Sequence, residues 1–589
     1  MSGASRDAYF YKKTVVLDKG RIDRVGQAIK DVRMNRALTV FLTFGAAVAA
    51  MTGGAGAAEP AMVMLRFSSA QTQSLEEWRQ TAKALAANRG CCDDVWFSTG
   101  ESFPGMDWHR KNLEVVRVAA EDLRKIGIRV SLQFEATIGH GDDFPTAEEK
   151  ARFDKPWTGW TGPDGTECRY CSCPRQTGFL KRLAEVSELY AVIRPEIVWI
   201  DDDLRLENHW PVTGREGPGC WCDRCVADFS KLEGRTWTRP ELHRAWKTDA
   251  ALQDRWGDFS AGSMAEVARV IACAFRKVSP KTRLGLQTSE NRKLLLGAVA
   301  RKLKQATGEK TAVRLGGGDY YDLSPYVQLR KSWRMVRARK ELDMEDLVDN
   351  WCTEVESYPR AYGSRSVRSI ALEAFSSVAW GFDTTSLFVM DRRSETDELY
   401  SRYLLKPLVT VTKFLNDYRA ANAGTVPAGF TCPDADPERI LMGLPILPGL
   451  GKSWGTVSGR QESSLGWGPV WGEFRNDLMT DFRRTPSAKL QSVRDRMSGN
   501  APLKLLSPFV GLVLPRVAAD GELRTVGLIG TRLDPQEAIA IQLQTAAEKA
   551  VWCELGAEPV ELRVQANGDR REVTVPSIGA WGMGYLVIR

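Results

Sequence analysis

The spacing of hydrophobic and polar positions divides most of the chain into short strand-like and longer helix-like segments. From residue 62 to about residue 415, apolar runs rich in β-branched residues alternate with stretches in which apolar residues recur at helical spacing. The runs predict strands at Met62–Phe67, Asp94–Ser98, Arg129–Ala136, Ile197–Asp202, Arg283–Thr288, Ala312–Leu315, Val348–Glu354 and Thr384–Met390. The stretches predict helices at Leu113–Lys125, Gly178–Tyr190, Ala265–Lys277, Leu294–Gln305, Tyr326–Lys340 and Val367–Ala379.

Eight strands that alternate with helices over about 350 residues are typical of a closed parallel barrel. A doubly wound open sheet also produces such alternation. That fold binds phosphates at a glycine-rich turn after its first strand, and no such turn follows the first strand here. We therefore predict the α/β class, with a (β/α)8 TIM barrel over residues 59–418.

The pattern changes after a helical stretch at Leu399–Asn416, which Pro407 is expected to kink. Residues 419–504 are rich in Gly, Pro and Trp and predict an irregular middle region. From Leu505 onward, alternation with period two returns between turn signals. Residues 505–589 therefore predict a C-terminal antiparallel β-domain resembling a sandwich.

The N-terminus has the organisation of an export signal. From Met34 a short basic start precedes an apolar run of about fourteen residues and then small residues. This order predicts a secretory signal that is cleaved after Ala57 or Ala58, within an N-terminal extension of residues 1–58, and translation that starts at Met34. An uncleaved membrane anchor is the alternative, although the run is short for one. The mature protein is predicted to be periplasmic or secreted, free of the membrane after cleavage.

Charge and composition exclude some partners. The formal charge of +7 arises mostly from residues 1–57, which carry nine Lys and Arg against four Asp and Glu. The remainder carries 72 against 70, which argues against a nucleic-acid partner. The 19 Trp residues fit either core packing or stacking on sugar rings.

Acidic residues gather where two of the predicted strands end, the place where such barrels carry their chemistry. The fourth strand ends in Asp201, Asp202 and Asp203, and the seventh in Glu354 and Glu356. These strands face each other across a barrel, and hydrolysis of a glycosidic bond needs one protonated and one ionised carboxyl group. Crowding three carboxylates raises the pKa of at least one, as a general acid requires. The alternative is that these acids are solvated turn residues or helix caps.

Six of the twelve cysteines lie in two clusters, Cys168, Cys171 and Cys173, and Cys220, Cys222 and Cys225. Disulfides are the default in an exported protein, but the C-x-C and C-x2-C spacings favour tetrahedral zinc. No His lies among these cysteines. A thiolate-only site would be closed and structural, so we expect a structural zinc ion and no catalytic cofactor.

Several segments resemble glycoside hydrolase family 42, the bacterial β-galactosidases with a clan A barrel. They are the carboxylates that end strand four, GPGCWCDRC with the helix CVADFSKLEGRTW, RYCSCPRQTGFLKRLAEV, TEVESYP and SIALEAFSSVAWGFDTTSLFVM. The resemblance covers roughly residues 165–415. It implies Glu354 as the nucleophile. It also implies a zinc site formed by Cys171, Cys220, Cys222 and Cys225, with Cys173 or Cys168 as alternatives to Cys171.

The strand-four end departs from the family pattern. Family 42 has Asn-Glu where this chain has Asp202-Asp203. By this correspondence Asp203 takes the acid/base role with a shorter side chain, and Asp202 contacts the sugar 2-hydroxyl. The acidic end is closer to the related family 164, whose activity is β-mannosidase. Both relatives assemble as trimers, so the resemblance also implies a homotrimer.

The predicted function is hydrolysis of a β-glycoside or oligosaccharide by a retaining double displacement, with Glu354 and Asp203 as the catalytic pair. The predicted substrate-binding residues are Asp202, Arg66, Glu135, Gln287, Asp319, Tyr320, Glu356 and Trp210. Trp221 fits a sugar platform or core packing equally well. Two alternatives are a barrel that binds carbohydrate without cleaving it and a metal-dependent hydrolase with its ion at Asp201–Asp203. The scarcity of His argues against the second.

Overall fold

The computed structural model describes the chain from Pro60 to Arg589 with interruptions. Its gaps are residues 101–103, 136, 140, 142–146, 148–150, 152–154, 207–216, 289–292, 322–324, 361–362, 391–396, 432–442, 457–498 and 500. The predicted export signal, Trp210 and most of the predicted middle region lie outside the described residues.

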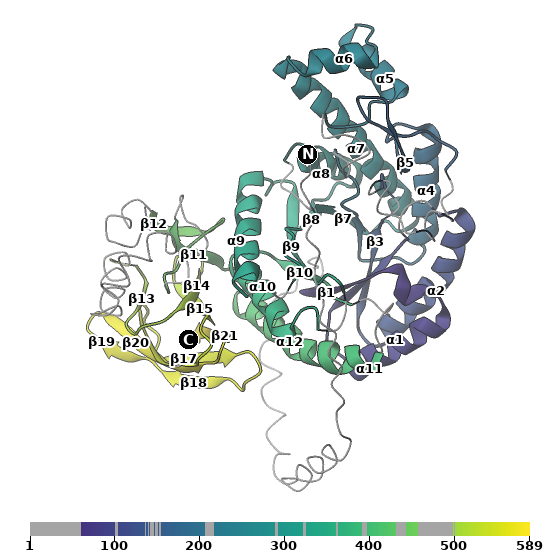
Figure 1. Ribbon diagram of the computed structural model, residues 1–589. Helices are drawn as coiled ribbons and strands as arrows, with labels where there is room; N and C mark the ends of the chain where they lie inside the picture. Colours follow the sequence, from purple (N-terminus) through teal and green to yellow (C-terminus); the bar gives the residue numbers. More distant parts are fainter. Residues whose placement is uncertain are drawn as a thin grey trace, which may run out of the picture. The chain divides into compact units, whose positions relative to one another are not determined.

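Eight parallel strands close into a barrel in the order β1-β10-β9-β8-β7-β6-β3-β2, so the predicted TIM barrel is confirmed. Figure 1 shows barrel strands, β1, β3, β7 and β8 among them, with helices around them. Spatial neighbours follow chain order, because each connection returns to the next strand along. Every predicted strand is present with its start or end displaced by no more than two residues. The barrel strands are β1 Val63–Phe67, β2 Asp94–Ser98, β3 Arg129–Phe134, β6 Ile197–Ile200, β7 Arg283–Thr288, β8 Thr311–Leu315, β9 Val348–Glu356 and β10 Thr384–Phe388.

Helices surround the barrel and bury their apolar faces against it. All six predicted helices are present. Pro407, where a kink was predicted, lies in the first turn of α12, directly after a π-helical turn at Ser401–Leu405. The helices are α1 Leu75–Ala87, α2 Met106–Lys125, α4 Thr177–Ala191, α5 Asp223–Glu233, α6 Arg239–Trp246, α7 Ala250–Val278, α8 Lys293–Thr307, α9 Pro325–Leu342, α10 Val367–Ala379, α11 Asp397–Tyr400 and α12 Lys406–Ala421, with a 3-10 turn at Ser69–Thr72 and the π turn at Ser401–Leu405. A hairpin, β4 Gly159–Thr161 and β5 Glu167–Ser172, precedes α4.

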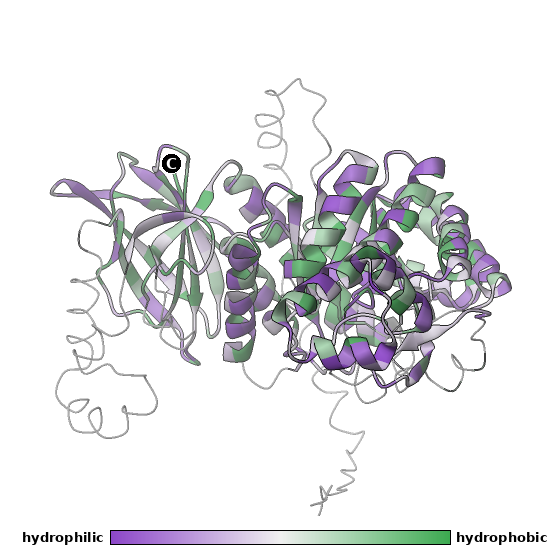
Figure 2. Cartoon of the chain, turned by 90° about the horizontal axis from the view of Figure 1, so that it is seen from above, coloured by the Kyte–Doolittle hydropathy of each residue, from purple (hydrophilic) through white to green (hydrophobic). Residues whose placement is uncertain are grey.

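The lower layer of the barrel interior is apolar. It contains Met64, Trp96, Trp199, Ala312 and Cys352. The rings of Trp96 and Trp199 stack with their centroids 4.4 Å apart. Gly285 leaves room for this pair, since a Cβ atom there would lie 2.5 Å from the Trp199 ring. Figure 2 shows hydrophobic residues on the strands and inner helix faces and hydrophilic residues on the outer faces.

The C-terminal antiparallel β-domain is also confirmed, and it consists of two sheets. One has the order β12-β11-β14-β15-β21-β17-β18 and the other β13-β16-β20-β19. The strands are β11 Val426–Thr431, β12 Lys452–Thr456, β13 Leu503–Leu505, β14 Gly511–Val517, β15 Leu523–Gly530, β16 Gln536–Leu543, β17 Lys549–Glu554, β18 Val560–Arg563, β19 Gln565–Asn567, β20 Arg570–Ile578 and β21 Met583–Ile588. Strands β11, β12 and β13 come from the predicted middle region, whose described parts therefore extend the β-domain.

Most of the described tryptophans serve the core. Eight are almost completely buried, namely Trp78, Trp96, Trp160, Trp199, Trp221, Trp256, Trp333 and Trp351. Trp221 packs against Trp256 with ring centroids 4.4 Å apart, so it is a core residue and not a sugar platform. Among the described residues, no helix is both long enough and apolar enough to cross a membrane.

Candidate active site

Above the apolar layer, towards the carboxyl ends of the strands, the barrel interior becomes polar. Period-two alternation places the residues two positions beyond the apolar layer on the same inner face. The side chains there are buried. Six of them are hydrogen-bonded to one another, namely Arg66, Gln133, Asp201, Gln287, Arg314 and Glu354, and the seventh, Ser98, donates to Glu135. Buried polar groups of this density belong to a functional site rather than to a packing core.

Glu354 is a buried carboxylate of this layer with two cationic partners and a phenol. Its Oε1 atom lies 3.2 Å from Arg66 Nη1 and also contacts the guanidinium group of Arg314. The Tyr320 hydroxyl donates to Oε2 at 3.2 Å. Gly316 leaves space for the carboxylate, because a Cβ atom there would lie 2.6 Å from Oε2. The three contacts hold both oxygens of Glu354.

The surrounding cations keep Glu354 ionised. Burial by itself raises the pKa of this carboxyl group, but the opposing effect of nearby cations is larger and lowers it below its usual range. These cations are Arg314, Lys331 and Arg66. The charge of Glu354, together with burial, raises the pKa of Tyr320, so the phenol stays protonated and donates. An ionised, oriented carboxylate is what a nucleophile requires.

Glu356 follows two residues later on β9, and its pKa is shifted in the opposite direction. Burial and the charge of Glu354 raise the pKa of Glu356. Its side chain forms an ion pair with Arg360 at 3.0 Å. Electrostatics therefore distinguish the two glutamates, and Glu354 is the one held in the ionised form.

Three consecutive carboxylates follow β6. One oxygen from each of Asp201, Asp202 and Asp203 lies within 4.8 Å of the others. Arg205 Nη2 lies 3.2 Å from Asp202 Oδ1 and 3.8 Å from Asp203 Oδ1. Asp201 and Asp203 are buried, whereas Asp202 is partly exposed. Asp202 also acts on Glu354, since its charge opposes the lowering of the pKa of that group.

A chain of amides and carboxylates joins the β6 end to the rest of the layer. Gln133 Nε2 donates to Glu135 Oε1 at 2.8 Å and to Asp201 Oδ1 at 2.9 Å. Gln287 Nε2 donates to the same Asp201 oxygen at 3.1 Å. Arg66 Nε donates to Gln133 Oε1 at 3.0 Å. The network therefore runs from Glu354 through Arg66 and Gln133 to Asp201.

The structure brings together most of the predicted substrate-binding residues but not all of them. Arg66, Glu135, Gln287 and Tyr320 belong to the network described above. Asp319 instead forms an ion pair with Arg334 of α9. Trp210 lies outside the described residues.

The residues of the site that were not predicted include Arg314, Gln133 and Arg205. Arg314 could have been found from the strand pattern. Every second residue of a strand faces the same side, so Arg314, two positions after Ala312, is expected on the inward face of β8. A charged residue at an inward position of a buried strand is rare unless it has a partner. Gln133 has the same signal in β3. Arg205 lies beyond the strand, and no sequence period indicates its position.

The cysteine cluster differs from its predicted composition in one member. Cys173, Cys220, Cys222 and Cys225 each offer a sulfur atom within 4.8 Å of the others. Cys173 therefore stands where Cys171 was expected. Cys171 lies inside β5, and Cys173 follows the end of that strand, where the chain turns towards α4. Cys171 is buried outside the cluster.

The four thiols fit a tetrahedral zinc ion. Cys173 Sγ lies 3.5 Å from the sulfur atoms of Cys222 and Cys225. Zn–S bonds of about 2.3 Å place tetrahedral sulfur atoms about 3.8 Å apart. The backbone N–H of Thr161 donates to Cys220 Sγ at 3.3 Å, a contact that supports a thiolate. The donor set is closed, so a metal ion there would be structural.

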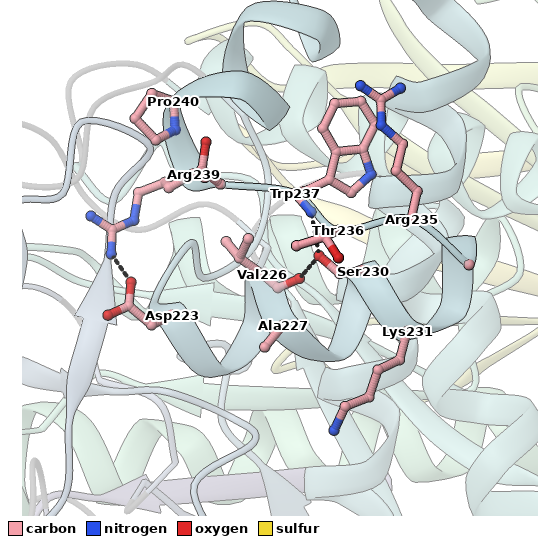
Figure 3. Close-up of a pocket in the computed structure, with 12 residues that line it drawn as sticks. Asp223, Val226, Ala227, Ser230, Lys231, Arg235, Thr236, Trp237, Arg239 and Pro240 are labelled. Carbon is pink, nitrogen blue, oxygen red and sulfur yellow. Dashed lines mark hydrogen bonds and ion pairs between the residues drawn. The ribbon is translucent and has the colours of Figure 1, made fainter.

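A separate hollow lies on α5, α6 and the turn between them (Figure 3). Its lining includes Arg239, which is bound to Asp223, and Trp237, whose backbone N–H donates to Ser230. Asp223 is the one carboxylate among its lining residues. The hollow therefore lacks the pair of carboxyl groups that the barrel interior provides.

Comparisons with solved structures match the architecture over nearly the whole chain. An α-L-fucosidase isoenzyme from Paenibacillus thiaminolyticus has a TM-score of 0.53 at 12% identity, covering 90% of this chain and 100% of that chain. A β-galactosidase from Rahnella sp. R3 has a TM-score of 0.52 at 12% identity, covering 90% and 98%. A GH42 β-galactosidase of G. stearothermophilus, solved as a catalytic mutant, has a TM-score of 0.52 at 10% identity, covering 90% and 98%. No protein-family model and no curated protein matches the sequence.

These likenesses define the class of fold: a TIM barrel followed by a β-domain, shared with family 42 β-galactosidases. The resemblance that the cysteine and carboxylate segments indicate is therefore confirmed at the level of the fold. The same architecture carries glycosidases named for two different sugars. The fold by itself therefore identifies no particular sugar.

Proposed function

We propose that this protein is a glycoside hydrolase that cleaves β-glycosidic bonds with retention of configuration. The observation that carries the proposal is the state of Glu354: a buried carboxylate held ionised by Arg66, Arg314 and Tyr320 in a barrel whose β6 exit carries three more carboxylates. Glycoside hydrolysis requires an ionised and a protonated carboxyl group on opposite sides of the bond. The glycosidases that share this fold support the same class.

In the proposed mechanism Glu354 attacks the anomeric carbon as the bond to the leaving oxygen breaks. Asp203 gives its proton to that oxygen, and the sugar is held on Glu354 as a covalent ester. Asp203 then takes a proton from water, and the resulting hydroxide displaces Glu354 from the anomeric carbon. Arg66 and Arg314 stabilise the carboxylate that departs, and Asp202 is assigned to the 2-hydroxyl group of the bound sugar.

We further propose that Cys173, Cys220, Cys222 and Cys225 hold a structural zinc ion. The cluster joins the end of β5, the loop after β6 and the start of α5. Zinc bound there fixes the chain that follows Asp203 and leaves no coordination position for substrate. Every catalytic step in the proposed mechanism belongs to side chains.

The decisive experiment is a screen of nitrophenyl β-galactoside, β-mannoside and other glycosides, followed by proton NMR of the first-formed anomer. A β-configured first product supports retention, and an α-configured first product contradicts it. If the wild type hydrolyses none of the glycosides, the proposal is wrong. A protein that binds glycans without turnover, with binding intact in Glu354→Gln, would be the non-catalytic barrel.

A catalytic metal ion at Asp201–Asp203 is the second candidate, because the three carboxylate oxygens lie within 4.8 Å of one another. Arg205 already neutralises part of this charge, which weakens the case for an ion. Loss of turnover with EDTA in a protein that remains folded would support the metal-dependent reaction, and unchanged turnover would support the two-carboxylate mechanism.

Export and assembly are predictions that follow from the sequence and from the resemblance. A secretory signal cleaved after Ala57 or Ala58 would yield a periplasmic or secreted enzyme. Mass spectrometry of the mature N-terminus tests the cleavage. Light scattering of the purified protein tests the homotrimer.

A further inference from the structure

Exposed tyrosines gather at the barrel mouth. The described part of the chain has four exposed tyrosines, Tyr321, Tyr326, Tyr358 and Tyr403. Tyr321 follows β8 and Tyr358 follows β9, so these two lie next to the strand ends that carry Tyr320 and Glu354. Tyr326, in the first turn of α9, instead packs its ring against Trp581 of the β-domain. Tyr321 and Tyr358 are 50% and 54% exposed. Exposed apolar rings that cluster are a sign of a binding surface.

The two loops that carry Tyr321 and Tyr358 are tied to each other and to the nucleophile. The backbone N–H of Tyr358 donates to the Tyr320 carbonyl oxygen at 3.1 Å. The Tyr320 hydroxyl in turn donates to Glu354. Tyr321 is the next residue after Tyr320. Tyr321 through the chain and Tyr358 through its backbone hydrogen bond are therefore both attached to Tyr320, which in turn contacts Glu354.

A buried network holds both loops in place from below. Gln328 Nε2 donates to the carbonyl oxygens of Asp319 and Tyr321 at 3.3 Å and 2.8 Å. Arg365 donates to Gln328 Oε1 at 2.7 Å and to the Glu356 carbonyl oxygen at 3.0 Å. Gln328 is completely buried. A surface preorganised in this way binds a ligand with a smaller loss of conformational entropy.

A stack of guanidinium groups and rings connects Tyr358 to the nucleophile. The Arg66 guanidinium, which contacts Glu354, lies 4.5 Å from the centre of the Phe388 ring. Arg360 lies 4.1 Å from the Phe388 ring and 6.0 Å from the Tyr358 ring. Tyr358 is therefore the outermost ring of a continuous series that begins at Glu354.

We propose that Tyr321 and Tyr358 form an aromatic platform that binds sugar rings on the leaving-group side of the bond attacked by Glu354. The proposal rests on the proposed glycosidase function and names its substrate class: an oligosaccharide rather than a glycoside with a small leaving group. Aromatic rings pack against the C–H faces of sugars, while the phenol hydroxyls reach sugar hydroxyls. The buried layer around Glu354 closes the inner end of the site, so the chain continues outward over the exposed rings.

The test compares substrates with and without a sugar on the leaving-group side. The probes are β-D-galactosyl and β-D-mannosyl fluoride and the corresponding β-1,4-linked trisaccharides, using the sugar that the wild type hydrolyses. The double variant Tyr321→Ala/Tyr358→Ala is expected to lower the ratio of kcat/KM for trisaccharide to that for fluoride about tenfold, and Tyr358→Phe to preserve it. Tyr403→Ala, an exposed tyrosine on the π turn, is the matched control and should leave the ratio unchanged.

An unchanged ratio, or equal losses on both substrates, overturns the platform. Binding of each trisaccharide to Glu354→Gln, measured by calorimetry, provides a second readout that needs no turnover. About tenfold weaker binding after removal of both rings supports the platform, and unchanged or undetectable binding overturns it. A wild type that hydrolyses neither these probes nor any glycoside of the screen contradicts the glycosidase function, and the binding measurement tests the platform separately. Equal melting temperatures check that the variants are folded.

Discussion

The ends of β9 and β6 both carry carboxylates but surround them with opposite charge. At β9, the buried carboxylate Glu354 receives two guanidinium groups and a phenol. At β6, two of three adjacent carboxylates, Asp202 and Asp203, share the guanidinium group of Arg205, and Asp201 accepts from the side-chain amides of Gln133 and Gln287. One end therefore has an excess of positive charge around a single acid, and the other an excess of negative charge.

This difference supports the roles that the proposed mechanism gives to Glu354 and Asp203. Excess positive charge favours the ionised form of a carboxyl group, whereas crowded carboxylates favour retention of a proton by one of them. A nucleophile belongs to the first environment and a proton donor to the second. The predictions below test this assignment, beginning with the largest expected effect.

Glu354→Gln should remove almost all turnover. An amide cannot form the glycosyl ester, so kcat is expected to fall by about 10⁴-fold or more. Glu356→Gln, on the same face of β9, is the matched control and should cost no more than about tenfold. Steady-state kinetics on the best aryl glycoside compare the two. Equal losses in both variants would remove the distinction between the two glutamates.

Asp203→Asn should lower kcat/KM by about 10²–10³-fold for substrates with poor leaving groups. The loss should shrink with dinitrophenyl glycosides, because their leaving oxygen needs little protonation. Asp202→Asn is expected to show a smaller loss that does not depend on the leaving group. If the dependence appears in Asp202→Asn instead, the acid role moves to that residue.

Arg314→Met should change the pH dependence of activity. The pKa of Glu354 is lowered in the folded protein, so this group contributes stability above its unfolded pKa, and that stability is lost as the pH falls through the folded pKa. Removing Arg314 raises the pKa of Glu354. The acidic limb of kcat/KM should therefore move to higher pH by about one unit. Arg334→Met is the control and should leave the acidic limb where it is in the wild type. An acidic limb that stays in place in Arg314→Met contradicts the role of Arg314.

Cys173→Ser should have the smallest effect on catalysis and a clear effect on stability. Loss of one zinc ligand is expected to remove most bound zinc and to lower Tm by about 5–10 °C, with turnover at 25 °C changed less than about threefold. Cys171→Ser should retain zinc. Elemental analysis and thermal melting distinguish the two variants, and retention of zinc by Cys173→Ser would show that the ion is not held by this cluster.

The fold could be predicted closely from the sequence, because strand and helix periods are local properties. The period-two segments and their connecting helices predicted the barrel, and carboxylates at two strand ends indicated where its polar site lies. Choosing between Cys171 and Cys173 was beyond a local pattern. The two cysteines lie two positions apart in the sequence, and only the turn after β5 decides which sulfur atom lies next to that of Cys222.

The sequence by itself determined the order of strands, their inward faces and the supply of acids at β6 and β9, since these depend on period and position along the chain. Tertiary structure alone decided that the pKa of Glu354 is lowered and that of Glu356 raised. Arg66, Arg314 and Glu354 are far apart in sequence, and their charges act on one another only because closing the barrel buries them within hydrogen-bond distance. The same closure joins Tyr358 to Tyr320. Interactions of this kind depend on distance and burial, which no local pattern records.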